Sequence, residues 1–289
     1  MEGVNKVAVI GSGTMGAGIA QVAIQNGYSS ILYDIDQQQL AKAKAQVFKR
    51  LERLVEKGRI LDEESIQAKE KLMVTTDLKS LEKVDLVIEA APEKLDIKKS
   101  IFHQLNDICS PETLFATNTS SLSITEIAGY IQDPSRLAGF HFFNPAPLMP
   151  LVEIVQGIST NQDTINRLKD FAEKIHKYPV VCQDTPGFIV NRVARPFYNE
   201  ALRIMNDQVA SVEQIDRIMK KAGGFKMGPF ELQDLIGIDI NLATTRTVYS
   251  SFYGENRFRP HYYQERMVQA GRLGRKTEGG FYDYASAEH

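Results

Sequence analysis

The chain has 289 residues, 43% of them hydrophobic and 24% charged, with a formal net charge of -2. This length suits two cooperating domains, and the composition is that of an ordinary soluble protein, which excludes wholesale disorder and a strongly basic nucleic-acid binder. No run of about 18 apolar residues marks a membrane span, and two cysteines without metal-ligand spacing predict no disulfide framework, no metal site and a reducing, cytoplasmic setting.

The first half of the chain alternates short apolar runs with helical patterns, which is typical of a parallel sheet with crossover helices. Nearly forty residues separate the second and third runs, more than one crossover helix needs. We therefore expect an inserted helical hairpin with its turn near Lys57 and Gly58. The predicted strands are residues 6–10, 30–34, 73–75, 86–89, 114–117, 138–142, 152–155 and 180–182.

A glycine-rich segment follows the first predicted strand and opens the first helix. Its pattern is G-x-G-x-x-G, and its residues are Gly11, Ser12, Gly13, Thr14, Met15 and Gly16. In a dinucleotide site the first glycine makes a tight turn, the second lets a pyrophosphate approach the backbone, and the third lets helix and strand pack closely. Asp34 ends the next strand at the distance expected for a carboxylate that binds ribose hydroxyls, which favours NAD over NADP. The alternative is a plain glycine-rich turn, with Asp34 capping the next helix.

A histidine and a glutamate stand out in the next part of the sheet. His141 lies near the end of the sixth predicted strand, at the edge where doubly wound folds bind their ligands. A dehydrogenase that acts on an alcohol needs a base for the hydroxyl proton, and histidine can accept and return a proton near neutral pH. Glu153 lies within the next apolar strand, where a lone carboxylate is costly to bury without a partner. We expect Glu153 to orient the His141 ring, the alternative being a histidine with a purely structural role.

Long helical patterns replace the strands in the last part of the chain. A boundary is therefore predicted between an α/β Rossmann-type domain, residues 1–183, and an all-α domain, residues 184–289. Thr185 and Pro186 have the residue types of a helix start, and Pro196 is expected to kink or interrupt that helix. Pro229 marks another helix start. Strand-like alternation returns only in the aromatic tail, residues 280–284.

Several longer segments resemble the 3-hydroxyacyl-CoA dehydrogenase family, and within it the stand-alone bacterial 3-hydroxybutyryl-CoA dehydrogenases. The resemblance covers nearly the whole chain, in the segments VAVIGSGTMGAGIA, DLVIEAAPEKLDIKKSIF, TNTSSLSITEIA, GFHFFNP, LVEIV, DTPGFIVNR, GPFELQDLIGID and LGRKTEGGFYDY. Glu278 departs from it, because the family commonly has glycine at that place. The resemblance implies the two-domain fold and NAD as the cofactor.

The resemblance also implies roles for individual residues. His141 and Glu153 match the catalytic pair of the family. Ser120 matches a hydroxyl that approaches both substrate and nicotinamide, and Asn191 matches a substrate-contacting amide. Further contacts with the cofactor or substrate are implied for Glu93, Lys98 and Asn144.

The implied reaction is the reversible NAD-dependent oxidation of an (S)-3-hydroxyacyl-CoA, such as 3-hydroxybutyryl-CoA, to the 3-ketoacyl-CoA. Three alternatives remain: a 3-hydroxyadipyl-CoA dehydrogenase, a dehydrogenase of free β-hydroxy acids, and a non-catalytic NAD-binding relative. The free-acid enzymes depend on a catalytic lysine, so the pair of His141 and Glu153 argues against them. Retention of the implied catalytic residues argues against a non-catalytic protein.

A CoA substrate carries phosphates, so cationic residues are expected near its site. Lys49, Arg53 and Lys57 follow one another at i, i+4 spacing on one helix face of the inserted hairpin, with Arg50 adjacent. The family's use of this region favours CoA binding there. The alternative is a solvated charged face, because glutamates interleave with these cations.

The family also implies a homodimer formed through the helical second half. Apolar residues in this half exceed what one small helical domain needs. They are Phe225, Phe230, Leu232, Leu235, Ile236 and Ile238.

Overall fold

The computed structural model describes residues 4–285 of the chain. The chain divides into two compact units, which we call unit 1 (Met1–Thr185) and unit 2 (Pro186–His289). Asp184 follows the last strand but is still tied to unit 1, because its carboxylate accepts hydrogen bonds from Ser123 Oγ and Thr125 N, both at 2.8 Å.

Unit 1 is built on one eight-stranded sheet with the strand order β3-β2-β1-β4-β5-β6-β7-β8. Every neighbouring pair is parallel except β6 and β7, which are antiparallel. The eight strands predicted for the first part of the chain are all present, and the mostly parallel Rossmann-type sheet is confirmed. The strands are β1 (Lys6–Ile10), β2 (Ser29–Tyr33), β3 (Leu72–Thr75), β4 (Leu86–Glu89), β5 (Leu114–Thr117), β6 (Leu137–Phe142), β7 (Leu151–Gln156) and β8 (Tyr178–Gln183).

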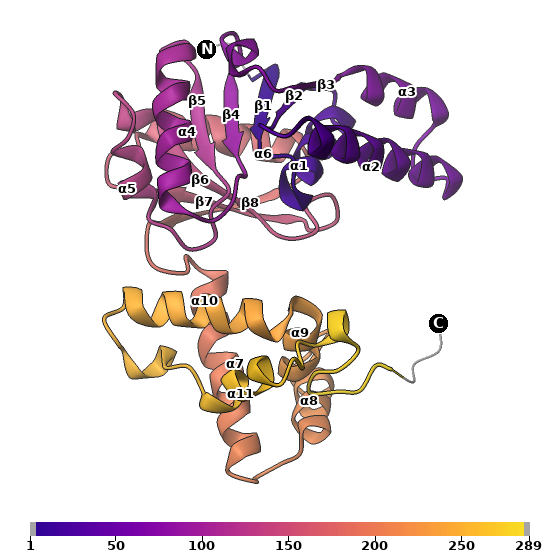
Figure 1. Cartoon of the computed structure of the whole chain (residues 1–289), viewed down its shortest axis with the longest axis vertical. Coiled ribbons are helices and arrows are strands. Elements are labelled where there is room, and N and C mark those ends of the chain that lie inside the picture. Colours follow the sequence, from indigo (N-terminus) through magenta and orange to yellow (C-terminus); the bar gives the residue numbers. More distant parts are fainter. Residues whose placement is uncertain (1–3, 286–289) are drawn as a thin grey trace. The chain divides into compact units, whose positions relative to one another are not determined.

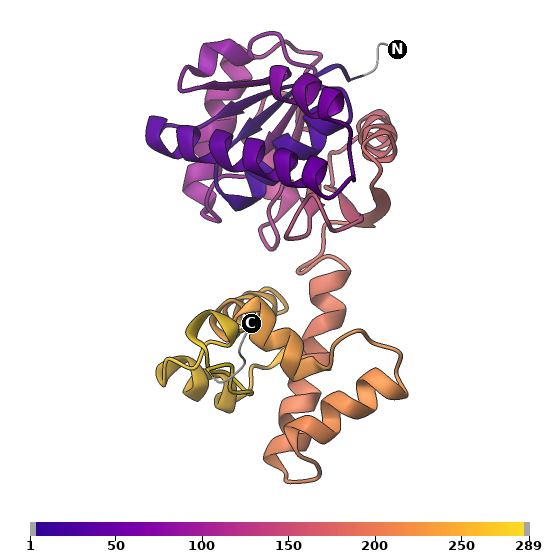
Figure 2. The ribbon, with the colours of Figure 1, turned by 90° about the vertical axis from the view of Figure 1, so that its right-hand side faces the viewer.

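Helices cover both faces of this sheet (Figure 1). They are α1 (Thr14–Gln25), α2 (Gln37–Glu56), α3 (Asp62–Glu70), α4 (Leu95–Ile108), α5 (Ile124–Ala128) and α6 (Gln162–Lys174), with short 3-10 turns η1 (Leu78–Leu81) and η2 (Pro134–Arg136). One apolar core joins α1, α2, α3 and α6 to one face, whereas Phe102 of α4 packs on Phe115 at the other. The predicted hairpin is confirmed as α2 and α3, which Figure 2 shows in front of the strands; Gly58, with φ 62°, turns the chain between them.

Unit 2 is helical, as the sequence predicts. Its helices are α7 (Val190–Asn206), α8 (Val212–Lys221), α9 (Pro229–Ile236), α10 (Ile238–Ser251) and α11 (Tyr262–Gln269), with 3-10 turns η3 (Asn256–Phe258) and η4 (Arg275–Thr277). Pro229 is the first residue of α9, in agreement with the predicted start. Across residues 4–285, no helix of either unit combines the length and the apolar character that crossing a membrane requires.

The first helix of unit 2 differs from the prediction. It begins at Val190 and not after Pro186, because Gly187 (φ 77°) and Phe188 (φ 49°) adopt left-handed conformations that cannot belong to a right-handed helix. Pro196 does not interrupt α7, which continues through it. The proline removes one backbone hydrogen bond, and the buried residues that follow it in α7 keep the later turns packed.

The aromatic tail is also not a strand, since only isolated bridges occur there among the described residues. It is instead fixed by the buried carboxylate of Asp234. This carboxylate accepts hydrogen bonds from the N–H groups of Phe281 and Tyr282, both at 3.0 Å, and from the Tyr284 hydroxyl at 3.1 Å. The alternation of aromatic residues therefore reflects packing around one buried acid and not a β-ladder.

Candidate functional site

The candidate site lies on one face of the sheet in unit 1. Glu89 and Thr117 are the last residues of β4 and β5, His141 is near the end of β6, and Glu153 is in β7. The residue before each of them belongs to the apolar core of the opposite face. Because side chains alternate along a strand, these four polar side chains share the other face.

His141 and Glu153 form the predicted pair. They are register partners in the antiparallel ladder of β6 and β7, and His141 Nδ1 lies 2.8 Å from Glu153 Oε2. Both residues are buried, with exposed fractions of 6% and 1%. A carboxylate in this position accepts a hydrogen bond from the Nδ1–H group. The lone pair of the neutral ring is then on Nε2, and the ring can act as a base through that atom.

A second buried acid was not singled out in the sequence. Glu89 is fully buried and binds the ammonium of Lys98 through both oxygens, at 2.7 and 2.9 Å. Its carboxylate also accepts hydrogen bonds from Thr117 Oγ1 at 2.6 Å and from Ala91 N at 2.7 Å. A glutamate that ends an apolar strand was the available signal, of the same kind as Glu153, and its partner lies nine positions later on the following helix.

Lys98 connects this acid to Glu93. The Lys98 ammonium lies 3.3 Å from Glu93 Oε2, and Glu93 Oε1 accepts hydrogen bonds from Thr119 Oγ1 at 2.7 Å and from Ser120 N at 2.8 Å. The hydroxyls of Ser120 and Ser121 bond to the same oxygen. Burial raises the pKa of Glu93, but Lys98 and these hydrogen bonds outweigh it and hold the pKa below its usual value. Glu93 is therefore an anion at neutral pH that fixes the Ser120 turn, and Lys98 is buried in an ion-pair network.

The glycine-rich segment has the geometry that a dinucleotide requires. Gly11 has φ 95°, and a Cβ on Gly16 would lie only 1.8 Å from the Gly11 oxygen, so both positions require glycine. A Cβ on Gly13 would meet no atom within 4 Å, which leaves open space beside the N-terminus of α1. No side chain caps that helix end, and its first turn contains no acid. These features fit a bound pyrophosphate, to which the helix N-terminus offers N–H groups and positive dipole.

Asp34 holds this segment from the neighbouring strand. Its Oδ2 accepts hydrogen bonds from Ser12 N at 2.7 Å and Ser12 Oγ at 2.8 Å. The carboxylate is thereby fixed beside the turn, with Thr14 and Met15 starting α1. Ser12 occupies a variable position of the motif, yet its N–H and hydroxyl hold the acid that the sequence predicts to bind ribose.

Asn144 and Asn118 lie next to the end of β6. Asn144 is exposed, two residues beyond the last residue of that strand, and its peptide bond to Pro145 is cis. Asn118 Oδ1 accepts a hydrogen bond from Phe142 N at 2.8 Å. This bond ties the chain after β5 to the strand of His141, a function for Asn118 that the sequence did not indicate.

The remaining predicted residues lie elsewhere. Asn191 is the second residue of α7, in unit 2. Lys49, Arg53 and Lys57 are exposed along α2 and at its C-terminal cap, opposite to the buried residues of that helix, and Arg50 is partly buried. One shared solvent-facing surface of cations is thus present on α2.

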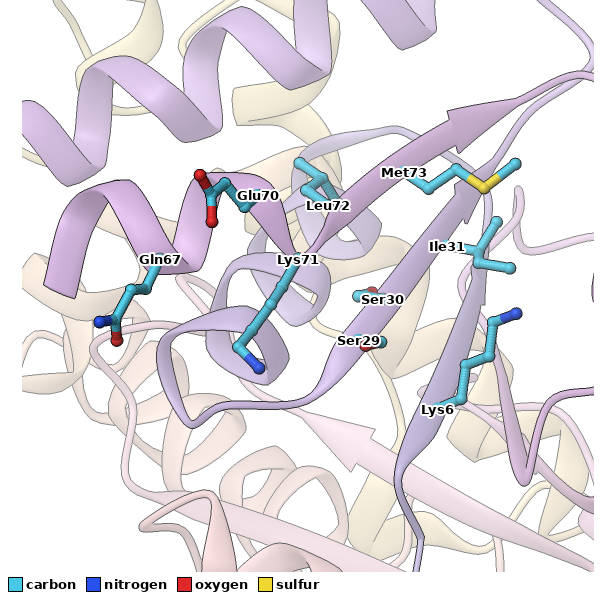
Figure 3. Close-up of a pocket in the computed structure, with 9 residues that line it drawn as sticks. All are labelled: Lys6, Ser29, Ser30, Ile31, Gln67, Glu70, Lys71, Leu72 and Met73. Carbon is cyan, nitrogen blue, oxygen red and sulfur yellow. The ribbon is translucent and has the colours of Figure 1, made fainter. Parts of the chain in front are cut away.

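A hollow of about 530 Å³ opens at the opposite ends of the strands (Figure 3). Lys6, Ser29 and Lys71 line it, where β1 and β2 begin and β3 is about to start. It is therefore separate from the edge that carries the glycine-rich turn. Neither there nor elsewhere in residues 4–285 do three or more His, Cys, Asp or Glu side chains gather as metal ligands would.

Comparison with known proteins matches both units. Residues 6–185 match the 3-hydroxyacyl-CoA dehydrogenase, NAD binding domain, and residues 187–284 match the 3-hydroxyacyl-CoA dehydrogenase, C-terminal domain. The chain is 49% identical to a 3-hydroxyadipyl-CoA dehydrogenase of Escherichia coli (strain K12), over 98% of this chain and 60% of that protein. It is 43% identical to a 3-hydroxybutyryl-CoA dehydrogenase of Clostridioides difficile, over 96% of this chain and 99% of the relative. The chain thus spans about three fifths of the first relative and nearly all of the second.

Solved structures agree with these similarities. The structure of a 3-hydroxybutyryl-CoA dehydrogenase from Escherichia coli K12 superposes with a TM-score of 0.97 at 48% identity, over 100% of this chain and 61% of that one. An (S)-3-hydroxybutyryl-CoA dehydrogenase from Ralstonia eutropha superposes with a TM-score of 0.94 at 37% identity, over 98% and 100% of the two chains. Both the sequence and the fold therefore relate this chain to the same group of proteins.

Proposed function

We propose that this chain, which belongs to the 3-hydroxyacyl-CoA dehydrogenase family, is an NAD-dependent oxidoreductase whose substrate pair is (S)-3-hydroxybutyryl-CoA and acetoacetyl-CoA. The main support is the buried pair of His141 and Glu153, whose Nδ1 and Oε2 atoms lie 2.8 Å apart, near the edge of the sheet at which β4, β5 and β6 end. The relatives named for a short acyl chain support this choice of substrate.

The residues of unit 1 suit a reversible proton transfer. In oxidation His141 Nε2 accepts the proton of the substrate hydroxyl, and Glu153 stabilises the imidazolium that forms. In reduction the ring returns that proton to the forming alkoxide. The Ser120 N–H, which donates to Glu93, holds the residue in place. When substrate binds, the Ser120 hydroxyl turns its proton from Glu93 to the substrate oxygen, and the Asn191 amide is a further substrate contact.

NAD would be held by the segment from Gly11 to Gly16, with its ribose on Asp34 and further contacts from Glu93 and Asn144. Bound NAD supplies the acceptor for the hydride that leaves substrate C3. The buried Lys98 acts on this site through Glu93, since its ammonium already binds Glu89 and Glu93. The protein contributes orientation and charge around the reacting atoms.

The proposed reaction is tested by NADH oxidation with acetoacetyl-CoA, beside NADPH and beside free acetoacetate. Turnover with NADH and the thioester alone supports cofactor and substrate together. Faster turnover of 3-hydroxyadipyl-CoA than of 3-hydroxybutyryl-CoA, measured in the oxidative direction, would replace the short-chain substrate by the dicarboxylic one. Turnover of free acetoacetate would remove the CoA requirement.

The exposed cations of α2 are proposed to bind the phosphates of CoA. Reversing the charge at Arg53 and Lys57, in the double variant R53E/K57E, is expected to raise the KM for acetoacetyl-CoA at least tenfold and to leave kcat nearly unchanged. Each lost ion pair with a phosphate weakens ground-state and transition-state binding alike, by about 1 kcal/mol. Steady-state kinetics at low ionic strength measure the effect.

The same kinetics on E56K, which changes an exposed charge of the same helix in the opposite sense, provide the matched control. Its KM is expected to stay the same or to fall. An unchanged KM in R53E/K57E would assign these cations to a solvated helix face.

We further propose that unit 2 forms a homodimer. Of the six apolar residues named above, Phe230 and Ile238 are buried within unit 2, so they are not available to a partner. Leu235 and Ile236 remain exposed, at 50% and 38%, and Ile240 on the adjoining α10 is 51% exposed. We propose that association covers these three exposed apolar side chains.

A dimer mass is expected for the wild type in light scattering, and a monomer mass for L235R/I240R, because two buried arginines without partners oppose association. K226E alters another exposed position of unit 2 and is expected to remain dimeric. A monomeric wild type would contradict the proposal.

We propose a reducing, cytoplasmic setting. Cys109 and Cys182 are both free, and burial raises the pKa of their thiols, to about 11 and about 12. Both thiols therefore stay protonated and weakly reactive at neutral pH, and neither requires an oxidising compartment.

A further inference from the structure

The segment that joins β6 and β7, residues 143–150, closes the hairpin that carries His141 and Glu153. We call it the hairpin loop. It contains Asn144, and its own hydrogen bonds are few: the N–H groups of Leu148 and Met149 both donate to the Pro145 carbonyl at 3.0 Å. Its position in unit 1 therefore depends on hydrogen bonds and packing contacts with the rest of the unit.

Besides one backbone bond, from Tyr178 N to the Pro150 carbonyl at 2.7 Å, Lys177 supplies side-chain hydrogen bonds to this loop. The residue precedes β8, is only 9% exposed, and donates from Nζ to the Ala146 carbonyl at 2.7 Å and to the Met149 carbonyl at 2.9 Å. No carboxylate in the described part of the chain forms an ion pair with it, and burial lowers its pKa. Charge-assisted bonds to backbone carbonyls thus offset the cost of burying this ammonium, and both of them end on the hairpin loop.

The same loop packs on the cofactor-binding helix α1. A Cβ on Gly18 would lie 3.2 Å from both Ala146 Cβ and Pro147 Cδ, and Ala146 is 1% exposed. The loop therefore lies between α1, whose first turn includes the end of the glycine-rich segment, and the Lys177 ammonium. The hairpin loop thus contacts the dinucleotide-binding helix α1 and directly follows β6, the strand that carries His141.

We propose that Lys177 is a positioning residue for the cofactor site: by holding the carbonyls of Ala146 and Met149 it fixes the hairpin loop against α1 and so places Asn144 beside the bound NAD. This inference rests on the proposed function only in taking the glycine-rich edge as the NAD site. Lys177 itself contacts neither the cofactor nor the substrate in this proposal.

The variant K177M keeps an unbranched side chain, one heavy atom shorter, and removes the ammonium. We expect its dissociation constant for NADH, from fluorescence titration of the full-length protein, to rise about tenfold, as when one charge-assisted contact no longer holds a site in place. In the cofactor-free protein, amide hydrogens of the hairpin loop should exchange faster, while those of β6 and β7 keep their rates. K177R retains donors and should recover most of the affinity. K174M, at an exposed lysine of α6, is the matched control and should bind NADH as the wild type does.

A second variant keeps the proposal testable if K177M folds poorly. In G18A the added methyl group of α1 contacts Ala146 and Pro147 of the hairpin loop closely and should displace the loop. We expect NADH binding to weaken severalfold, although alanine stabilises the helix itself. Wild-type NADH affinity in both K177M and G18A would overturn the positioning role, as would faster exchange in the loop without a change of affinity. Binding is measured without turnover, so these results are independent of whether acetoacetyl-CoA is the substrate.

Discussion

Replacing His141 by glutamine is expected to lower kcat for acetoacetyl-CoA reduction by about 10³-fold, the usual size of a general acid–base contribution. The amide can accept or donate a hydrogen bond but cannot exchange a proton with the substrate oxygen. NADH affinity should stay near the wild-type value, because His141 lies away from the glycine-rich segment that carries the pyrophosphate site. Stopped-flow or steady-state NADH oxidation measures the rate, and a fluorescence titration measures the affinity.

The variant H103Q is the matched control, since His103 is an exposed histidine on α4 in the same unit. It is expected to keep full activity. E153Q should also lose much of the rate, because it removes the charge that stabilises the imidazolium while keeping the side-chain shape. A kcat for H141Q within tenfold of the wild type would mean that another group transfers the proton.

The second large effect is expected on stability. Replacing Glu89 by glutamine leaves the buried Lys98 ammonium without its principal counter-ion, which should lower the free energy of unfolding of unit 1 by about 3 kcal/mol. Lys98 would keep only the longer contact with Glu93. Because Glu93 fixes Ser120, the rate with acetoacetyl-CoA should fall as well. Urea unfolding curves, read from signals of unit 1, measure the stability change.

A double-mutant cycle separates the pair from its surroundings. E89Q/K98M removes both charges and should recover a large part of the stability that E89Q loses, because no uncompensated buried charge remains. E82Q, at an exposed glutamate just before β4, should unfold like the wild type. Equal losses in E89Q and E82Q would show that the network of Glu89 and Lys98 contributes little.

The sheet could be predicted from the sequence because its strands are short apolar runs between clear breaks. The pairing of His141 and Glu153 was also predictable, since a carboxylate in an apolar strand requires a partner and His141 was the candidate on the strand before it. Glu89 ends an apolar strand in the same way, but the sequence offers no comparable partner on a neighbouring strand. Its partner Lys98 lies on a helix, and nothing in the spacing of a charged helix distinguishes a buried lysine from a solvated one.

The errors arose where backbone conformation overrules residue type. Thr185 and Pro186 have the composition of a helix start, but the left-handed conformations at Gly187 and Phe188 delay the helix. Phe188 gives no sequence signal for such a conformation, because bulky residues rarely adopt it. The tail after Gly279 has the alternation of a strand, yet its order comes from hydrogen bonds to Asp234, more than forty positions earlier. Long-range contacts of this kind leave no local pattern.

The antiparallel register of β6 and β7 also limits where the chain can change in length. His141 meets Glu153 because the two stand opposite each other in one ladder. A single residue inserted or deleted within either arm would turn the following side chains to the other face and separate acid from base. Insertions and deletions in this hairpin are therefore tolerated only outside the two strands. The catalytic pair depends on the register of β6 and β7 as much as on the identity of its two residues.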